Sequence, residues 1–341
     1  MPFAEPKSLA SAALLALLVA CAAMQGPTAT AVAPAPGTVI ASVPIGRGPT
    51  LLALSPDGSV VYAASVGTLI AIRTDTNTIA ASASIDPYTT GIAVTRDGER
   101  ILLISVQSSS VAVLQASNLK QTSRIGLPQP GLYPGGYSRI RVSANGRTAW
   151  LVNEDMYLAI VDLAAGTSSK LTLDMRPTDV GLSRDGQTVY VLGCKTYCTT
   201  GTIEVINVAS QNVTATIDVG PGPHSFALSP DEQRGYSTNL GGPSLSIVGL
   251  ASRTVRATLP VGIEPTGLAV APDGGRVYVS SNRTGTLTVA RGDGHAVLAT
   301  VQVPGTVRDV VVSPDGRRAY VSTSAPNAVV VLDTARLGAG T

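Results

Sequence analysis

Histidine, cysteine and charged residues are scarce in this chain of 341 residues, which contains two histidines, three cysteines and 13% charged residues. So few zinc-binding side chains make a metal centre hard to assemble, and we expect no bound metal. No Cys-x-x-Cys-His sequence occurs, which excludes attachment of a c-type haem, and we expect no other cofactor. Because the net charge is only +2 and arginine is scattered, the chain lacks the basic stripe with which proteins bind nucleic acids.

Long apolar runs are also missing, with one exception near the start of the chain. The run from Leu9 to Ala23 is shorter than a comfortable transmembrane helix and lies where a signal peptide would. Its end, Leu18-Val19-Ala20-Cys21, resembles the lipobox of bacterial lipoproteins. That resemblance implies removal of residues 1–20, a lipid on Cys21, and a protein anchored to a membrane of the cell envelope, in the periplasm or at the outer surface. An ordinary secretory signal cut after a nearby alanine is the alternative.

The other two cysteines lie close together, in the run Gly-Cys194-Lys-Thr-Tyr-Cys198-Thr-Thr-Gly. An exported protein can form disulfides, and a bridge here would pin a surface loop. It would add little global stability, because the loop that it closes is short. We predict a disulfide between Cys194 and Cys198, with free thiols or a metal site as alternatives.

A turn tetrapeptide related to Ser-Pro-Asp-Gly recurs seven times, each time between two runs typical of short strands. The copies begin at Ser55, Thr95, Ser143, Ser183, Ser229, Ala271 and Ser313, at intervals of 40 to 48 residues. Proline and aspartate suit the early positions of a β-turn, and glycine accepts the positive φ that such turns need. A repeat of this length built from short strands predicts an all-β protein, a seven-bladed β-propeller with four antiparallel strands per blade.

The run after each turn carries a further signature. Val60 to Ser65 reads Val-Val-Tyr-Ala-Ala-Ser, and its counterparts begin at Thr188, Arg276 and Arg318. These runs resemble the YVTN family of β-propeller repeats, and the best matches lie in the fourth, sixth and seventh repeats. The resemblance extends from about Thr38 to Thr334 and implies the fold, but it implies little about activity because propellers serve many functions.

The two ends of the repeat region predict how the ring closes. Thr38 to Gly46 reads like a fourth strand, whereas the chain ends after a third strand, Ala328 to Asp333. The N-terminal strand would therefore complete the last blade and remove an open junction. We predict a signal peptide (1–20), a lipidated cysteine with an Ala-, Pro- and Thr-rich tether (21–37), and a monomeric propeller (38–341).

Two insertions indicate which face of the propeller binds. Leu127 to Tyr137 lengthens the interval between the second and third turns to 48 residues, and the Cys194–Cys198 loop lengthens a later interval to 46. The first insertion links an outer strand to the next inner strand, and the second joins strands two and three of a blade. Both connections lie on the face opposite the repeated turns, and insertions on one face often mark the binding surface.

Charged and aromatic side chains gather in the predicted channel mouth on that face. Arg141 stands where the other repeats have small residues, and Asp179 of the next blade is its expected partner. The set suits an anionic or polar ligand, although Arg–Asp pairs such as Arg308 with Asp309 would serve equally well to link blades. The candidate ligand-binding residues are Arg47, Tyr133, Tyr137, Arg139, Arg141, Arg176, Asp179, Arg308 and Asp309.

The resulting hypothesis is an exported, membrane-anchored propeller that binds a protein partner or a small polar ligand without catalysis. The alternative is a lactonase-like or lyase-like enzyme, with His224 and Glu264 at the mouth as acid and base. We expect Arg139→Ala combined with Asp179→Ala to abolish binding and to leave the melting temperature within a few degrees.

Overall fold

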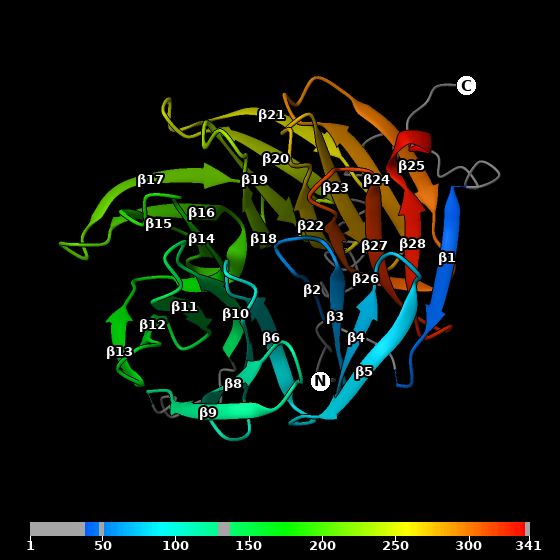
Figure 1. The fold of residues 1–341 in the computed structure, drawn as a ribbon. Coiled ribbons are helices and arrows are strands. Elements are labelled where there is room, and N and C mark those ends of the chain that lie inside the picture. The colour runs from blue at the N-terminus through cyan, green and yellow to red at the C-terminus, as the bar shows by residue number, and fades with distance from the viewer. Residues whose placement is uncertain (1–37, 48–50, 129–136, 338–341) are drawn as a thin grey trace, which may run out of the picture.

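Seven four-stranded antiparallel sheets form a ring around a central channel (Figure 1). The computed structural model describes residues 38–47, 51–128 and 137–337. Within those ranges the only helical elements are two short 3₁₀ turns, η1 (Thr196–Cys198) and η2 (Thr334–Arg336). No helix in the described part of the chain has the length and apolar character to cross a membrane. The predicted seven-bladed, all-β propeller is confirmed.

Six blades run from the channel outward in chain order, and in the last blade the N-terminal strand β1 takes the outer position. The inner strands are β2 (Leu51–Leu54), β6 (Thr89–Val94), β10 (Tyr137–Val142), β14 (Arg176–Leu182), β18 (Pro223–Leu228), β22 (Pro265–Val270) and β26 (Thr306–Val312). The second strands are β3 (Val60–Ser65), β7 (Arg100–Ser105), β11 (Thr148–Asn153), β15 (Thr188–Cys194), β19 (Arg234–Asn239), β23 (Arg276–Ser281) and β27 (Arg318–Ser324). The third strands are β4 (Thr68–Arg73), β8 (Ser110–Gln115), β12 (Tyr157–Asp162), β16 (Gly201–Asn207), β20 (Ser244–Gly249), β24 (Thr286–Arg291) and β28 (Ala328–Asp333). The outer strands are β5 (Thr78–Ser84), β9 (Gln121–Gly126), β13 (Thr167–Thr172), β17 (Val213–Val219), β21 (Thr254–Pro260), β25 (Val297–Gln302) and β1 (Val39–Pro44).

The N-terminal strand closes the ring, as predicted. β1 pairs antiparallel with β28, with Val43 opposite Val329, so the last blade has the order β1-β28-β27-β26. Figure 1 shows this junction as the blue strand beside the red one. Chain ends far apart in sequence thus share one sheet, and the outer edge of β28 is covered.

The repeated tetrapeptide forms the same turn in successive blades. In the first copy, the Ser55 hydroxyl donates to the Asp57 carboxylate (2.6 Å) and accepts from the backbone N–H of Val60 (2.9 Å). The hydroxyl is the largest cause of a lowered pKa for the Asp57 carboxyl. Gly58 has φ +74°, whereas Glu232 occupies the same position in the fifth copy at φ 56°. These carboxylates bond within their own turns, which accounts for their recurrence without a role in binding.

The hydrophobic core consists of layers between adjacent blades. Tyr62, Tyr278 and Tyr320 of the second strands are almost completely buried in these layers. Two of these tyrosines lie directly across from an alanine of the inner strand, Tyr62 from Ala53 and Tyr278 from Ala269, whereas Tyr320 lies across from Val311. A small residue at this position leaves room for the neighbouring aromatic ring to pack between blades.

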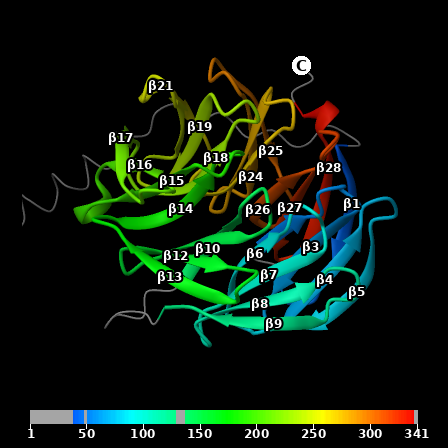
Figure 2. The same ribbon diagram turned by 60° about the vertical axis from the view of Figure 1, so that its left-hand side comes forward.

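The connections divide between two faces. We call the face with the repeated turns the turn face, and the opposite one the insertion face. The insertion face carries the loops between second and third strands and the links from each outer strand to the next inner strand. Figure 2 shows β10, β14 and β18 near the centre and β9, β13 and β17 at the periphery. Most of the Leu127 to Tyr137 insertion lies outside the described residues.

Candidate functional site

A cavity of about 460 Å³ opens at the channel end on the insertion face, and we call it the mouth. A second cavity of about 200 Å³ lies deeper among the inner strands, and both are lined by Leu51, Ser138, Arg139 and Asp309. The mouth therefore continues into the channel. The predicted site residues that line it are Arg139, Arg176, Cys194, Cys198, His224, Arg308 and Asp309.

Arg139 lines both the mouth and the deeper cavity. From β10 in the third blade, its guanidinium donates to the Ser225 hydroxyl (3.0 Å) and to the backbone oxygen of Thr266 (3.3 Å), which belong to the fifth and sixth blades. The Ser225 hydroxyl also donates to Thr266 oxygen at 2.7 Å. This network holds the positive charge in place on the floor of the mouth, where an incoming anion would meet it.

His224 lies beside this network, with its Nδ1 atom 3.1 Å from the Ser225 hydroxyl oxygen. Burial, and secondly the charge of Arg139, lower the pKa of the imidazole to about 4. His224 is therefore neutral at pH 7 and offers a ring N–H or a ring nitrogen lone pair rather than a positive charge.

Asp179 and Asp309 connect neighbouring blades. The Asp179 carboxylate accepts the backbone N–H of Phe226 in the next blade (2.8 Å), and the Asp309 carboxylate accepts that of Leu52 in the next blade (3.0 Å). Both aspartates stand four residues before the repeated turn of their blade, so the same carboxylate-to-backbone hydrogen bond links two pairs of neighbouring blades. Burial raises the pKa of Asp309, and the nearby Arg139 charge opposes that rise. These carboxylates are thus occupied by the backbone, which limits what they can offer a ligand.

Arg141 forms the ion pair expected from the sequence, with its guanidinium 3.3 Å from the Asp179 carboxylate. The two side chains differ in exposure, because Arg141 is 40% exposed towards the channel and Asp179 only 1%. Arg141 also donates to the backbone oxygen of Ile140 at 3.1 Å. Arg141, which stands where the other repeats have small residues, therefore links the third and fourth blades.

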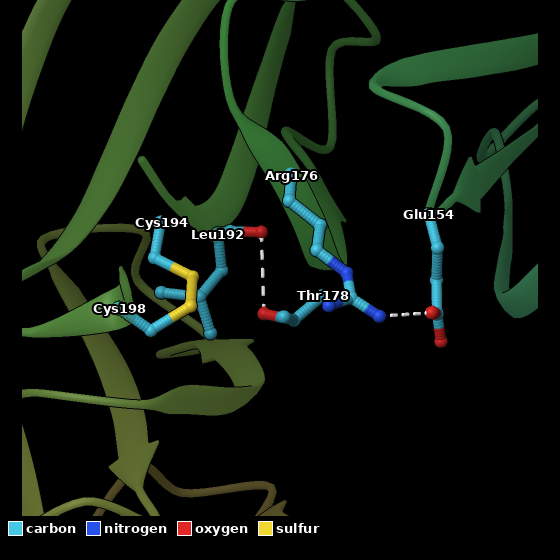
Figure 3. Close-up of a disulfide and its surroundings, with 6 residues drawn as sticks. All are labelled: Glu154, Arg176, Thr178, Leu192, Cys194 and Cys198. Atoms are coloured by element: carbon cyan, nitrogen blue, oxygen red, sulfur yellow. Dashed lines mark hydrogen bonds and ion pairs between the residues drawn. A yellow bond between two sulfur atoms is a disulfide. The ribbon is translucent and has the colours of Figure 1, made fainter. Parts of the chain in front are cut away.

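The wall of the mouth contains a second ion pair, shown in Figure 3, between Arg176 and Glu154. Glu154 is not among the residues that the sequence predicted for the site. Glu154 lies in the loop between β11 and β12, on the insertion face, and the blade topology alone could have placed it there. Cys194 and Cys198 form a disulfide beside this pair, with Cα atoms 5.0 Å apart.

Arg308 is an exposed cation of the mouth. Its backbone oxygen accepts hydrogen bonds from the hydroxyls of Thr266 (2.8 Å) and Ser280 (3.1 Å), which fix the main chain. Its guanidinium forms no hydrogen bond or ion pair with any residue in the described ranges. With Glu154 paired to Arg176 and Asp309 bound to backbone N–H groups, Arg139 and Arg308 leave the mouth cationic.

Other predicted residues lie elsewhere. Glu264 does not line the mouth, and its carboxylate faces Arg283 at 4.0 Å, so no contact joins it to His224. Arg47 offers its backbone oxygen to the Ser65 hydroxyl and also lies outside the lining. Tyr137 begins β10, with its backbone opposite Asn153. Two predicted residues, Cys21 and Tyr133, lie outside the described residues.

The described ranges hold no group of three or more histidine, cysteine, aspartate or glutamate side chains that could bind a metal ion. The groups at the mouth include a neutral imidazole and three guanidinium groups, of which that of Arg176 is paired with Glu154. Such an arrangement can orient a carboxylate or phosphate group by charge and by directed hydrogen bonds.

The fold and the mouth define the chain as a seven-bladed β-propeller with a cationic channel mouth. Solved structures of the same fold include hydrazine synthase of Kuenenia stuttgartiensis, at 19% sequence identity and a TM-score of 0.74 over 85% of this chain and 96% of that one. The propeller domain of Cps50 (Swd1) of Myceliophteria thermophila matches at 9% identity and a TM-score of 0.74 over 86% and 98%. No protein-family model and no curated protein matches the sequence. At these identities the likeness shows the fold alone.

Proposed function

We propose that this protein is an exported, membrane-anchored binding module that receives an anionic group of a protein partner or a small polar ligand at its mouth. The observation that carries the proposal is the cationic mouth, in which Arg139 is fixed by Ser225 and Thr266 and the Arg308 guanidinium is exposed. Propellers commonly serve as binding scaffolds, because a rigid ring presents variable loops on one face.

Anion binding at the mouth can be measured with citrate, succinate and inorganic phosphate as probes. A ligand that binds only the folded protein raises its stability, by about 2.7 kcal/mol at a concentration 100 times the dissociation constant. We expect at least one probe to raise the melting temperature of the wild type, and Arg308→Gln and Arg139→Gln each to reduce that rise at least fivefold.

Arg317→Gln is the matched control, because Arg317 is an exposed arginine that follows a repeated turn on the opposite face. It should leave the rise unchanged. Equal effects of all three substitutions, or no rise with any probe, would refute binding at the mouth.

Export and anchoring are supported by the lipobox-like sequence that ends at Cys21. We expect the wild type to fractionate with membranes and Cys21→Ser to release it into the soluble fraction. Retention of the variant in membranes would contradict a lipid anchor on this cysteine.

The lactonase-like or lyase-like alternative stays a prediction from sequence. Metal analysis of the purified protein tests it: a stoichiometric divalent metal that His224→Ala removes would favour an enzyme.

A further inference from the structure

The exposed apolar side chains are unevenly distributed between the two faces. Of the large apolar residues that are exposed in the described ranges, five lie on outer strands at the circumference of the ring. None of those residues lies in a connection of the turn face. The remaining six all lie in connections of the insertion face: Val66, Tyr88, Met156, Tyr197, Leu240 and Ile263. Apart from the circumference, the insertion face is thus where exposed apolar side chains are available for an interaction surface.

Two of these residues sit on connections that are bonded to one another through their backbones. The N–H of Gly222 donates to the oxygen of Cys198 (2.9 Å), and the N–H of Leu240 donates to the oxygen of Gly222 (2.7 Å). The N–H of Gly241 adds a bond to the oxygen of Pro221 at 3.0 Å. We call these three connections, residues 195–200, 220–222 and 240–243, the loop platform.

The loop platform is rigid for identifiable reasons. The disulfide closes its first connection, and the approach between the other two leaves no room for a side chain. A Cβ atom on Gly222, which has φ +59°, would lie 2.8 Å from the backbone nitrogen of Gly241. A rigid support lowers the entropy lost on binding, because the loops are already ordered.

Tyr197 and Leu240 are the apolar side chains that the loop platform presents. Tyr197 is 92% exposed and has φ 63°, a conformation that non-glycine residues seldom adopt. Leu240 is 40% exposed and lines the mouth. An exposed tyrosine on an ordered loop provides a large contact area at low entropic cost, as in antibody binding sites. The fold itself gains nothing from leaving this ring in water.

We propose that the loop platform and the mouth form one docking site for a protein segment that carries a carboxylate next to a large apolar side chain. The inference rests on the proposed function, because the carboxylate is the anionic group that the mouth receives. Arg139 and Arg308 supply the complementary charge, and Tyr197 and Leu240 bind the neighbouring apolar side chain.

A library of random 12-residue peptides displayed on phage provides a defined probe for the purified full-length chain. We expect the selected peptides to contain Asp or Glu close to Phe, Trp or Leu. Binding of one selected synthetic peptide, measured by fluorescence polarisation, should weaken at least tenfold in Tyr197→Ser and in Leu240→Ser. Ile79→Ser and Val255→Ser, which remove exposed apolar side chains from outer strands, should change it less than twofold.

The results separate this inference from the proposed function. If citrate, succinate and phosphate all fail to bind, the proposed function fails. If an anion binds but no peptide is selected, or the selected peptides bind the Tyr197→Ser and Leu240→Ser variants as well as the wild type, the docking inference alone is wrong. A concentration-dependent dimer in sedimentation experiments that Tyr197→Ser disrupts would also overturn it, because the platform would then bind a second copy of the chain.

Discussion

Replacing Asp179 by alanine should destabilise the propeller, because this carboxylate is an acceptor that the backbone needs. It accepts the N–H groups of Phe226 (2.8 Å) and of Val180 (2.8 Å) and lies 3.3 Å from Arg141. In Asp179→Ala both N–H groups lose their acceptor. The cost of a buried donor without an acceptor is about 1–3 kcal/mol each.

The surroundings of Asp179 place the expected cost near the lower end of that range. The residue lines the deeper cavity of about 200 Å³, which is large enough for water to replace part of the carboxylate. The ion pair with the 40% exposed Arg141 contributes at most about 1 kcal/mol. We expect a total loss of about 2–4 kcal/mol, or about 4–8 °C in melting temperature at about 2 °C per kcal/mol for a domain of this size.

Arg141→Gln is the matched control, because it removes the ion pair and keeps both backbone acceptors. Urea unfolding followed by circular dichroism should show a loss of about 1 kcal/mol or less for Arg141→Gln. Equal losses for the two variants, or a loss below 1 kcal/mol for Asp179→Ala, would refute the role of the carboxylate as a link between blades. The structure also corrects an expectation from the sequence: Arg139→Ala with Asp179→Ala should lower the melting temperature and cannot report on binding alone.

Three further predictions concern stability, each measured by unfolding. Burial, and secondly the Asp174 carboxylate, raise the pKa of Glu204 from 4.5 to about 7, so the stability of the wild type should fall as the pH rises between these values. Glu204→Gln should therefore be more stable than the wild type by up to about 3 kcal/mol at pH 8. An equal gain in stability at pH 4 and pH 8 would contradict this. Gly222→Ala should cost about 1–3 kcal/mol through its positive φ and a 2.8 Å backbone contact, whereas Gly46→Ala, with nothing within 4 Å, should be neutral. Deleting residues 1–46 removes β1 and exposes the edge of β28. The melting temperature should therefore fall, and light scattering should detect aggregation. A truncated monomer as stable as the wild type would show that β1 is dispensable.

The sequence indicated the face that carries the mouth, but not the contacts within the mouth. The two stretched intervals indicated the insertion face, and Arg139, Asp179 and Asp309, each four residues before a repeated turn, lie on inner strands. The sequence could not show that a carboxylate at that position accepts the N–H of the next blade, because this contact joins strands 47 residues apart for Asp179 and Phe226. Arg176 likewise pairs with Glu154 of the preceding blade, and this contact depends on the conformation of the loop between β11 and β12.

The sequence by itself determined the architecture of this protein. Seven similar turns, each between two short strand-forming runs, specify the strands and their number through local turn geometry. Only the tertiary structure decided which charges remain available. Ring closure and blade packing bring distant carboxylates against backbone N–H groups, and what is left at the mouth is a fixed Arg139 and an exposed Arg308 beside Tyr197 and Leu240.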